Sequence, residues 1–470
     1  MTVDLQALHY AFARQHRASR DLPAADLSTR RVLLDSLHAL LIEGRGDLVQ
    51  AISDDFGGRS RAETDILEIL PLITAIRHAR AHVRRWMRDE PRRVDLSLKP
   101  GSAWVRHEPL GVIGVIAPWN YPLFLTLGPA IDALAAGNRV LIKPSEASPA
   151  FAAVLARLVA ERFDATWLTV LAGGVEVAQA LSALPLDHLV FTGSTAVGRH
   201  ILRAAAEHLT PVTLELGGKS PAIVAPDFAI DRAAGSIAFG RYLNAGQTCV
   251  APDYALVPAA SARRFAEGVL AAAMRRYPTI ADNGDYSTII DARHHRRLTD
   301  AIDEARRAGA EILTHPAPTA PGQRIAPTVV LGAPDDCTLM REEIFGPVLP
   351  VKPYATLDAA LAFVRSRPRP LALYCFAHGT RTQRAILDGA TSGGVTINGT
   401  LLHVGQHSMP FGGIGASGMG AYHGRDGFRR FSHARGVHKA GPINMFERLG
   451  PPWGTTARLT LRLLGGLKAR

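Results

Sequence analysis

Cysteine is scarce in this chain of 470 residues, which has three of them, Cys249, Cys337 and Cys375. An odd number at wide spacing excludes a disulfide framework and favours a reducing compartment. Neither Cys-x-x-Cys nor His-Glu-x-x-His occurs, so the sequence predicts no metal site. Cys337 and Cys375 lie outside any motif, and we interpret both as packing residues.

Long uninterrupted apolar runs are also missing. One long uncharged run, Leu110 to Ile131, contains Pro118, Pro122 and Pro129, so it predicts a buried strand, a turn and the start of a helix rather than a transmembrane span. Near the amino terminus, Asp4 stands where a signal peptide would need an apolar core. We therefore expect a cytoplasmic protein.

Acidic residues are fewer than basic ones, 42 against 53, which gives a formal net charge of +11. The basic residues cluster in Arg77–Arg93 and again in Arg458–Arg470. No nucleic-acid-binding module or aromatic platform accompanies them, so we expect no nucleic-acid partner. A solvated basic surface that attracts anionic cofactors is the simpler interpretation.

Hydrophobic residues make up 47% of the chain, and their pattern predicts the fold class. The first hundred residues have helical periodicity, and from Val112 short apolar runs alternate with helical stretches. Such alternation is typical of a parallel sheet with helices on both faces. A second alternating set runs from Tyr254 to Ile397. The chain is therefore predicted to be an α/β protein with two doubly wound domains.

Several helix boundaries can be read directly. Leucines from Leu33 to Leu41 recur at helical spacing after Ser28 and Thr29, either of which is a candidate N-cap. A second helical pattern, from Leu48 to Phe56, is predicted to end at Gly57-Gly58. Another helix is expected over Pro129–Ala136.

A carboxylate and a thiol terminate two successive segments. Glu215 lies in the apolar run Val212–Leu216, and Cys249 follows Gly246-Gln247-Thr248. The intervening chain has room for a strand and a helix that bring the two side chains face to face. A thiolate attacks carbonyl carbons, and a nearby carboxylate can activate water to release the adduct. A lone cysteine is more often a small buried hydrophobe, but these neighbours favour a nucleophile.

Two further motifs follow predicted strands. In Pro118-Trp119-Asn120 a rigid turn holds an amide donor that can stabilise an oxyanion. Gly193-Ser194-Thr195-Ala196-Val197-Gly198 opens a helix whose N–H groups suit a pyrophosphate. Its spacing matches neither the Rossmann fingerprint nor a P-loop, and the same turn is also a common strand-to-helix connection.

Two acidic positions suit a nucleotide. Lys143 and Glu146 follow a predicted strand, where a carboxylate can accept hydrogen bonds from ribose hydroxyls and repel a 2′-phosphate. Two ordinary exposed charges are the alternative. Glu343 and Phe345 stand two apart, so in a strand they share a face, where one can hold a ribose and the other can back a planar ring.

Taken together, these motifs resemble the aldehyde dehydrogenase superfamily from about Arg30 to about Gly436. The chain is most similar to the class-3-like branch and, within it, to bacterial coniferyl aldehyde dehydrogenases. The motifs that carry the resemblance are Pro118-Trp119-Asn120, Lys143-Pro144-Ser145-Glu146, Phe191-Thr192-Gly193-Ser194-Thr195, Leu214-Glu215-Leu216-Gly217-Gly218-Lys219, Gly246-Gln247-Thr248-Cys249, Glu343-Ile344-Phe345-Gly346-Pro347, Pro410-Phe411-Gly412-Gly413 and, for the branch, Ala251-Pro252-Asp253-Tyr254 and Tyr422-His423-Gly424.

The resemblance implies a mechanism. Cys249 attacks an aldehyde, the Asn120 amide holds the oxyanion, hydride passes to NAD, and Glu215 activates the water that hydrolyses the thioester. It also implies a set of cofactor-binding residues, in which NADP is a possible replacement for NAD. These residues are Trp119, Lys143, Glu146, Gly193, Ser194, Thr195, Ala196, Val197, Gly198, Glu343 and Phe345.

The implied domains are a Rossmann-like cofactor domain over 1–216 with a bridging hairpin near 94–115, a catalytic domain over 217–400, and a segment over 401–470. That last segment returns to the cofactor domain, adds a bridging or oligomerisation element, and ends in a basic tail. The family suggests a homodimer. Leucines of the tail, Leu459, Leu463, Leu464 and Leu467, can dock on a partner or lie on a membrane surface, and we favour docking.

The predicted substrate is an aromatic or phenylpropenyl aldehyde, of the coniferyl type. A medium-chain or long-chain aliphatic aldehyde is an alternative, and acyl transfer to coenzyme A is disfavoured because Glu215 is present. A non-catalytic binding protein on the same fold is a further alternative. Asn398-Gly399-Thr400 departs from the family pattern, in which we expect an acidic residue after the asparagine.

Overall fold

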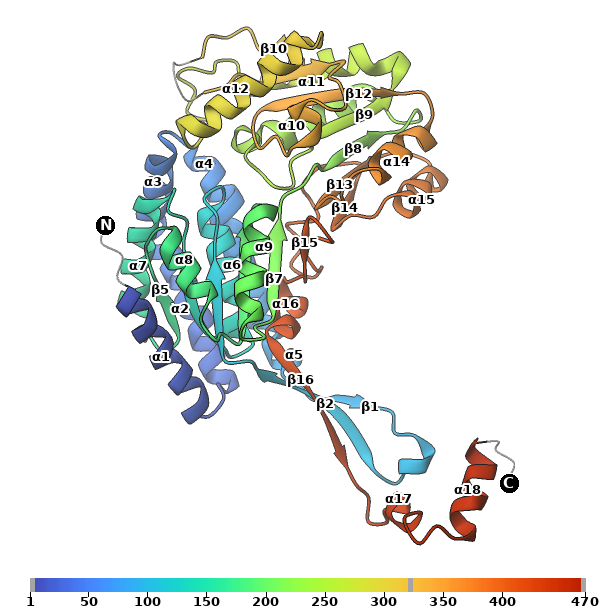
Figure 1. Ribbon diagram of the computed structural model, residues 1–470. Coiled ribbons are helices and arrows are strands. Elements are labelled where there is room, and N and C mark those ends of the chain that lie inside the picture. Colours follow the sequence, from blue (N-terminus) through green and yellow to red (C-terminus); the bar gives the residue numbers. More distant parts are fainter. Residues whose placement is uncertain (1–4, 320–323, 466–470) are drawn as a thin grey trace.

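The computed structural model describes residues 5–319 and 324–465. Three β-sheets organise it: a six-stranded sheet in one lobe, a seven-stranded sheet in a second lobe, and a three-stranded sheet that forms an arm projecting from the first lobe (Figure 1). The predicted α/β class with two parallel sheets is confirmed. The strands of the seven-stranded sheet all lie within residues 217–400.

The six-stranded sheet has the order β15-β7-β6-β3-β4-β5. Five strands are parallel and β15 is antiparallel to β7. Apolar residues alternate toward two helical layers, since Ile113 and Val115 belong to one core and Val112 and Ile116 to the other. The strands are β3 Val112–Ile116, β4 Arg139–Lys143, β5 Leu168–Val170, β6 His188–Gly193, β7 Val212–Leu216 and β15 Gly418–Met419.

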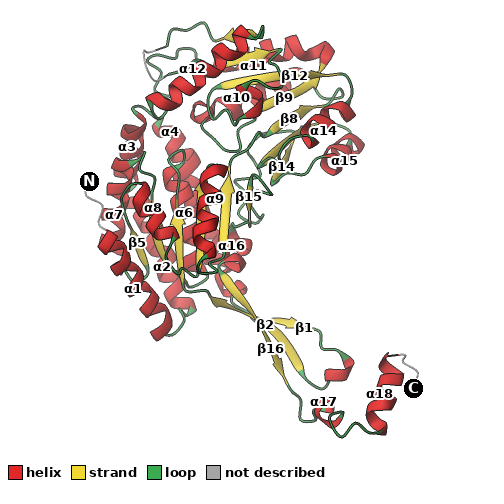
Figure 2. Ribbon diagram, in the orientation of Figure 1, coloured by secondary structure: helices red, strands yellow, loops and turns green. Residues whose placement is uncertain are grey.

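Helices cover both faces of this sheet (Figure 2). One layer contains α1 Leu5–Asp21, α8 Val175–Ser182 and α9 Thr195–Ala206. The other layer and its neighbours contain α2 Leu27–Glu43, α3 Arg45–Phe56, α4 Arg61–Thr64, the π-helical turn η1 Asp65–Ile69, α5 Leu70–Trp86, α6 Pro122–Ala135, α7 Pro149–Arg162 and α16 Gly424–Arg430.

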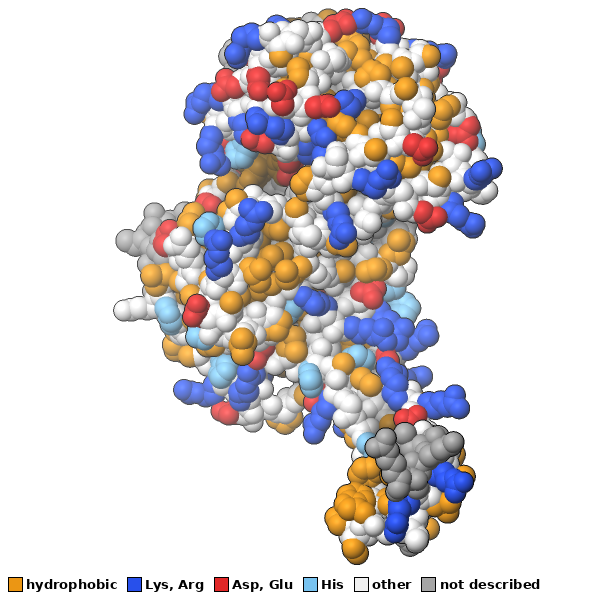
Figure 3. Space-filling view, turned by 45° about the vertical axis from the view of Figure 1, so that its right-hand side comes forward, with side chains coloured by type: hydrophobic (Ala, Val, Ile, Leu, Met, Phe, Trp, Pro, Cys, Tyr) orange, Lys and Arg blue, Asp and Glu red, His pale blue; other side chains and the backbone are white. Residues whose placement is uncertain are grey.

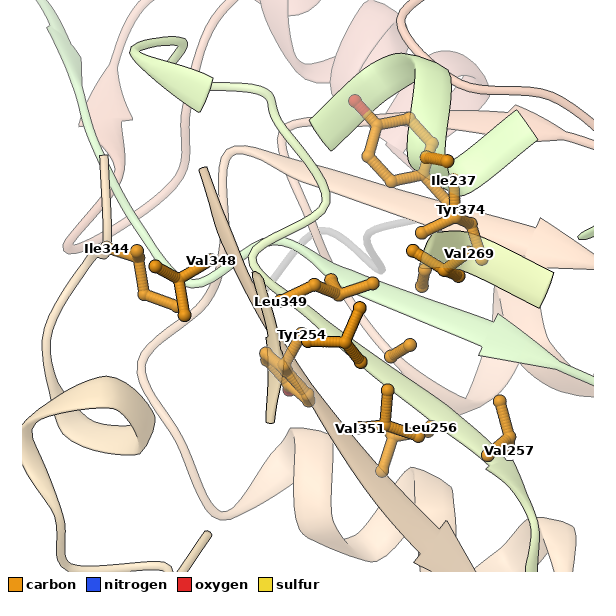
Figure 4. Close-up of a cluster of buried hydrophobic side chains, with 14 of the residues drawn as sticks. Ile237, Tyr254, Leu256, Val257, Val269, Ile344, Val348, Leu349, Val351 and Tyr374 are labelled. Carbon is orange, nitrogen blue, oxygen red and sulfur yellow. The ribbon is translucent and has the colours of Figure 1, made fainter. Parts of the chain in front are cut away.

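The seven-stranded sheet has the order β10-β11-β12-β9-β8-β13-β14 and is parallel except for β10 at its edge. Figure 4 shows part of its core, which includes Leu256, Leu349 and Val351 from two adjacent strands and Val269 from a helix of the same lobe. The strands are β8 Pro221–Val224, β9 Tyr254–Pro258, β10 Glu311–Thr314, β11 Thr328–Leu331, β12 Val348–Tyr354, β13 Ala372–Phe376 and β14 Gly394–Ile397.

The helices of this second lobe are α10 Ile230–Tyr242, α11 Ala262–Arg276, α12 Ala292–Arg307, α13 Thr338–Arg341, α14 Leu357–Arg365 and α15 Thr380–Gly389, with 3-10 turns η3 Leu243–Gly246 and η4 Ala259–Ser261. The arm contains β1 Glu90–Arg92, the 3-10 turn η2 Leu96–Leu98, β2 Ser102–Pro109, β16 Ser432–Lys439, α17 Met445–Arg448 and α18 Thr455–Gly465.

The arm ends in an apolar tip. Phe446, Trp453, Leu459 and Leu463 are each more than half exposed there, and hydrophobic side chains gather at the lower end of the molecule in Figure 3. The tail residue Leu467 lies outside the described residues. No described helix is long and apolar enough to cross a bilayer.

Four sequence-based expectations need correction. The hairpin near 94–115 is formed instead by β1 and β2, and β3 belongs to the six-stranded sheet because its residues are apolar on both faces. The N-cap of α2 is Asp26, whose carboxylate accepts a hydrogen bond from the backbone N–H of Thr29, rather than Ser28 or Thr29. The predicted end at Gly57 is confirmed, with a left-handed φ of 65°.

The helix expected over Pro129–Ala136 begins at Pro122 instead. Pro122 suits the first turn, where its missing N–H is not needed, and Gly128 has no Cβ to clash with the ring of Pro129. The segment with Glu343 and Phe345 is a loop rather than a strand, and Phe345 has a φ of 50°.

The start of α6 depends on a buried carboxylate from another element. Glu68 accepts hydrogen bonds from the N–H groups of Leu123 (2.8 Å) and Phe124 (3.0 Å). It also pairs with Arg59 at 2.7 Å, and both side chains of the pair are fully buried. Because α6 follows the Asn120 turn, this contact also fixes where that turn lies.

We predict that Glu68→Gln lowers the free energy of unfolding by about 3 kcal/mol, because it leaves Arg59 buried and unpaired. Urea unfolding measures the change. Asp35→Asn is the control, since the Asp35–Arg80 pair is about half exposed on both sides and should contribute less than about 1 kcal/mol. Equal effects of the two substitutions would contradict the role assigned to Glu68.

Candidate active site

The predicted meeting of Cys249 and Glu215 is present. Cys249 Sγ lies 3.9 Å from Glu215 Oε1, although 34 residues separate them in the chain. Glu215 lies near the carboxyl end of β7, and Cys249 lies in a turn after η3. The carboxyl ends of parallel strands are where ligands bind in such sheets, and this arrangement follows that rule.

The loop before Cys249 is held by unusual backbone geometry. Asn244, Ala245 and Gly246 have φ values of 51°, 49° and 75° in succession. A Cβ at Gly246 would lie 2.2 Å from the carbonyl oxygen of Gly346, so only glycine fits there. The Gln247 side chain then anchors the loop through bonds to the Asn244 and Thr288 carbonyls and the Ile290 N–H.

Glu215 is buried, and among residues 5–319 and 324–465 no cationic side chain lies within hydrogen-bond reach of it. Its Oε2 accepts hydrogen bonds from the Tyr422 hydroxyl at 2.7 Å and the Thr192 hydroxyl at 3.5 Å. Burial raises the pKa of Glu215 to about 7, while the bonds from Tyr422, Thr192 and Cys249 act in the opposite direction. A carboxylate with this pKa can gain and lose a proton near neutrality, as a general base must.

The Cys249 thiol is strongly biased toward its neutral form. Burial raises its pKa well above the usual value, and the negative charges of Glu215 and Glu343 raise it further. The backbone N–H groups of Val250 and Cys249 lower it. An anion on or beside the sulfur would be stabilised by these two N–H groups.

Asn120, which belongs to the lobe of the six-stranded sheet, contacts the loop that precedes Cys249. Its side-chain Nδ2 donates to the Gln247 carbonyl at 3.1 Å, and it is 2% exposed. A carboxamide has two N–H groups, so this contact occupies one of them. Asn120 and Cys249 line the same cleft, and the amide is thus available to an oxygen bound there.

Two cavities meet at Cys249 and Glu215. The first, of about 180 Å³, is almost entirely apolar and is lined by residues including Tyr121, Phe124 and Phe411. The second, of about 380 Å³, is more polar and is lined by the same pair. An apolar substrate and a polar cofactor can therefore approach one thiol from two directions.

The polar cleft collects several predicted cofactor residues. Trp119, Gly193, Ser194, Glu343 and Phe345 all line it, together with the predicted catalytic residue Asn120. The rings of Trp119 and Phe345 meet edge to face at a centroid distance of 5.3 Å. The Glu343–Phe345 loop therefore reaches the cleft as predicted, although it is not a strand. His294 and Arg297 from α12 also line the cleft, and no sequence motif marked them.

The residues of the glycine-rich turn, 193–198, differ in whether they line the cleft. Gly193 and Ser194 line the cleft, and Ser194 caps α9 by accepting from the N–H of Val197 at 3.3 Å. Thr195 donates instead to the Ala416 carbonyl at 3.0 Å. Ala196 and Val197 are exposed on the first turn of α9, beside the cleft but not lining it.

Gly198 has a packing role, because a Cβ there would lie 2.8 Å from the Leu216 side chain.

Lys143 and Glu146 lie apart from the thiol. Lys143 Nζ pairs with Glu146 Oε2 at 2.6 Å; the lysine is buried and the glutamate is half exposed. Glu146 lines a separate cavity of about 500 Å³ with Ala7 and Leu8 of α1, and with Glu176 at the start of α8. Sequence patterns did not assign α1 to this site, because its register with the sheet depends on tertiary packing.

Two features of the cleft fit a bound dinucleotide. Glu343 Oε1 is buried and has no hydrogen-bond partner in the part of the chain that the structure describes, so it can accept a hydrogen bond from a ligand hydroxyl. Burial raises the pKa of Glu343 to about 8. A Cβ at Gly217 would lie 1.8 Å from Glu343 Oε2, so the glycine creates the space for this carboxyl. The N-terminus of α9 at Ser194 supplies the N–H groups that suit a pyrophosphate.

A buried ionic network holds the Glu343 loop. Asp253 pairs with Lys219 and Arg241 and accepts a hydrogen bond from the N–H of Ile344. Lys219 also donates to the Glu342 carbonyl at 2.9 Å. Lys219 was noted in the sequence only as part of a motif, and its partners identify it as an anchor for the loop.

Comparison with known proteins supports the same assignment. The sequence pattern of the aldehyde dehydrogenase family matches residues 3–437. A probable coniferyl aldehyde dehydrogenase of Pseudomonas aeruginosa is 48% identical over 453 residues, which cover 96% of this chain and 94% of the relative. The coniferyl aldehyde dehydrogenase of Pseudomonas sp. strain HR199 is 42% identical, with 94% of this chain and 92% of that protein covered.

The fold agrees as closely. The structure of the substrate-bound state of Staphylococcus aureus AldH aligns with a TM-score of 0.91 and 36% identity, and covers 96% of this chain and 98% of that one. The family resemblance seen in the sequence motifs is thereby confirmed. This chain belongs to the aldehyde dehydrogenase family, whose members are NAD(P)-dependent oxidoreductases that act on aldehydes.

Proposed function

We propose that this chain oxidises an aromatic or phenylpropenyl aldehyde of the coniferyl type to its carboxylic acid, with NAD as the preferred cofactor. The observation that carries the proposal is the position of Cys249 and Glu215 where an apolar cavity meets a polar cleft. Aromatic side chains in the apolar cavity suit a flat ring. The Pseudomonas relatives bear the name of such an activity.

In the proposed reaction Cys249 is the nucleophile. Its thiolate attacks the carbonyl carbon, and the resulting oxyanion accepts hydrogen bonds from the Asn120 amide and the Cys249 N–H. When bound, NAD⁺ supplies the hydride acceptor. Glu215 then removes a proton from the water that attacks the thioester, which releases the acid and restores the thiol.

The remaining site residues are proposed to hold the cofactor. Ser194, with the first turn of α9, suits the pyrophosphate, and Glu343 suits a ribose hydroxyl. Glu146, which pairs with Lys143, is proposed to accept a hydrogen bond from a second ribose. Its negative charge would repel a 2′-phosphate, which supports NAD over NADP.

We also propose that the arm forms part of a homodimer interface. A hydrophobic tip that projects from the body of a monomer, as in Figure 1, exposes apolar area that a second copy would cover. Sedimentation velocity of the full chain tests this, and a monomer at micromolar concentration would oppose it. The division into cofactor, catalytic and return segments is proposed on the same family grounds.

The substrate assignment predicts a preference among aldehydes. Turnover measured as NADH formation should be fastest with coniferaldehyde and cinnamaldehyde, and lower with benzaldehyde and with aliphatic aldehydes of rising length. Cys249→Ser should reduce every rate by about 10⁴-fold or more, because a hydroxyl is a far weaker nucleophile than a thiolate. The fastest rate on long aliphatic aldehydes would keep the mechanism and overturn the substrate. No NADH with any aldehyde would overturn the reaction.

The role of Glu215 predicts a specific pH dependence. As a base it acts in its ionised form, so thioester hydrolysis should be lost below its pKa of about 7 and should rise to a plateau above it. Glu215→Gln should still give one equivalent of NADH per site in a rapid burst and then stall, because the thioester is not hydrolysed. Quenched-flow measurement of NADH from pH 5.5 to 9 tests both points.

The hydroxyl of Tyr422 predicts a further shift. Its hydrogen bond stabilises the ionised form of Glu215, so Tyr422→Phe should move the inflection of the hydrolysis rate to higher pH. A loss of rate at every pH without such a shift would show that Tyr422 acts through packing alone. Tyr10→Phe is the control, because Tyr10 is 69% exposed on α1.

A further inference from the structure

The residues proposed to stabilise the oxyanion come from different lobes and must be kept in register. Asn120 follows β3 of the six-stranded sheet, and Cys249 precedes β9 of the seven-stranded sheet. Two elements joined only by side chains can shift relative to each other. A misplacement of about 1 Å at such a site can cost about 100-fold in rate.

Asn244 ties these two loops together. Its Nδ2 donates to the Asn120 carbonyl at 3.0 Å and to the Gln247 carbonyl at 3.2 Å. The same Gln247 carbonyl accepts from Asn120 Nδ2 at 3.1 Å. One amide group thus holds the backbone of Asn120 and the acceptor that orients its side chain. Asn244 is fully buried, so water does not compete for these contacts.

The backbone of Asn244 is built for this position. Its left-handed φ of 51° is one that asparagine and glycine tolerate better than other residues. Its own N–H donates to Glu63 Oε1 at 2.8 Å, which fixes the turn independently of the side chain. The side chain is therefore presented to the Asn120 loop by a turn that has its own support.

Other contacts of these loops remain when Asn244 is changed. Arg59 Nη1, from the connection between α3 and α4, also donates to the Asn120 carbonyl at 3.1 Å, and the Tyr121 hydroxyl is 2.7 Å from the Thr248 hydroxyl. The first contact holds the Asn120 backbone, and the second keeps the two loops adjacent. Neither of them touches the Gln247 carbonyl, so they do not orient the Asn120 amide.

We propose that Asn244 is a positioning residue for the oxyanion site, which acts by fixing the Asn120 amide against the Gln247 carbonyl so that its second N–H faces the reacting oxygen. The proposal rests on the proposed function, in which Cys249 attacks an aldehyde. It assigns to Asn244 a contribution to the step that forms an oxyanion and none to the reactivity of the thiol itself.

The experiment compares two reactions of Cys249 in the variant Asn244→Gly, which keeps the left-handed turn and removes the amide. Single-turnover NADH formation from an aldehyde passes through an oxyanion. Alkylation of Cys249 by iodoacetamide displaces iodide and forms none. We expect the first rate to fall by about 10-fold or more, and the second to stay within about twofold of wild type.

Asn120→Ala calibrates the effect and should slow aldehyde oxidation by about 100-fold or more, because the donor itself is gone. The double variant Asn120→Ala/Asn244→Gly should be no slower than Asn120→Ala, since a positioning residue has nothing left to position. Multiplied losses in the double variant would overturn the proposal. So would an unchanged oxidation rate in Asn244→Gly, or an equal loss of alkylation and oxidation.

A matched control separates chemistry from stability. Asn138 is also fully buried and donates to two carbonyls, those of Ala133 at 3.1 Å and Phe431 at 2.8 Å, away from the thiol. Asn138→Gly should lower the melting temperature and leave the ratio of oxidation to alkylation unchanged. If Asn244→Gly does not fold, Asn244→Asp provides the same comparison, because it keeps the shape and has no N–H donor.

These variants distinguish failure of the proposed function from failure of the positioning role. Wild-type rates in Asn120→Ala would remove the oxyanion assignment and the positioning role with it. Slow oxidation in Asn120→Ala together with wild-type oxidation in Asn244→Gly would overturn the positioning role alone.

Discussion

A buried carboxylate with only hydroxyl and thiol partners is the constraint on which the rest of the site depends. Glu215 is held by Tyr422 and Thr192 and faces Cys249, and no cation lies within hydrogen-bond reach among the described residues. A cation would pin the carboxylate in its ionised form, whereas hydroxyls leave its pKa near neutrality. This arrangement requires a strand from the far end of the chain, β15, to pair with β7, where Gly418 lies opposite Glu215.

Buried or partly buried carboxylates from other elements also fix where helices start. Glu68 accepts from the first N–H groups of α6, Asp55 accepts from those of Ala150 and Phe151 in α7, and Asp132 accepts from the N–H of His423 beside α16. Helix N-termini leave such N–H groups unsatisfied, and a local N-cap side chain is absent from each of these helices. Elements far apart in sequence are thereby locked together. The loops that carry Asn120 and Tyr422 inherit their positions from these contacts.

The sequence was sufficient for the parts of the fold that depend on local pattern. Apolar runs such as Val212–Leu216 are buried strands, and Gly57 ends a helix in a left-handed conformation. It was also sufficient to pair Cys249 with Glu215, because the two residues lie at the ends of successive segments with room between them for a strand and a helix. It did not reveal Tyr422 or Asn244 as partners of the site, since 207 residues separate Tyr422 from Glu215 and nothing local marks the contact of Asn244 with Asn120. Such contacts follow from packing between lobes. The strand expected at Glu343 failed because Phe345 adopts a left-handed backbone that ionic anchors at Asp253 support.

The charges around Cys249 connect the two halves of the proposed reaction. Glu215, Glu343 and the thiol are three acidic groups close to one cleft, and burial raises the pKa of each. At neutral pH the cleft therefore carries fewer negative charges than it has acidic groups. A positively charged ligand in the cleft would lower all three pKa values together, because an opposite charge favours each ionised form. An oxidised nicotinamide is such a cation and its reduced form is not. Under the proposed function the oxidised cofactor thus favours thiolate formation, against the opposing charges of the two carboxylates. The carboxylates attract the cofactor less strongly once hydride has been transferred and its positive charge is lost.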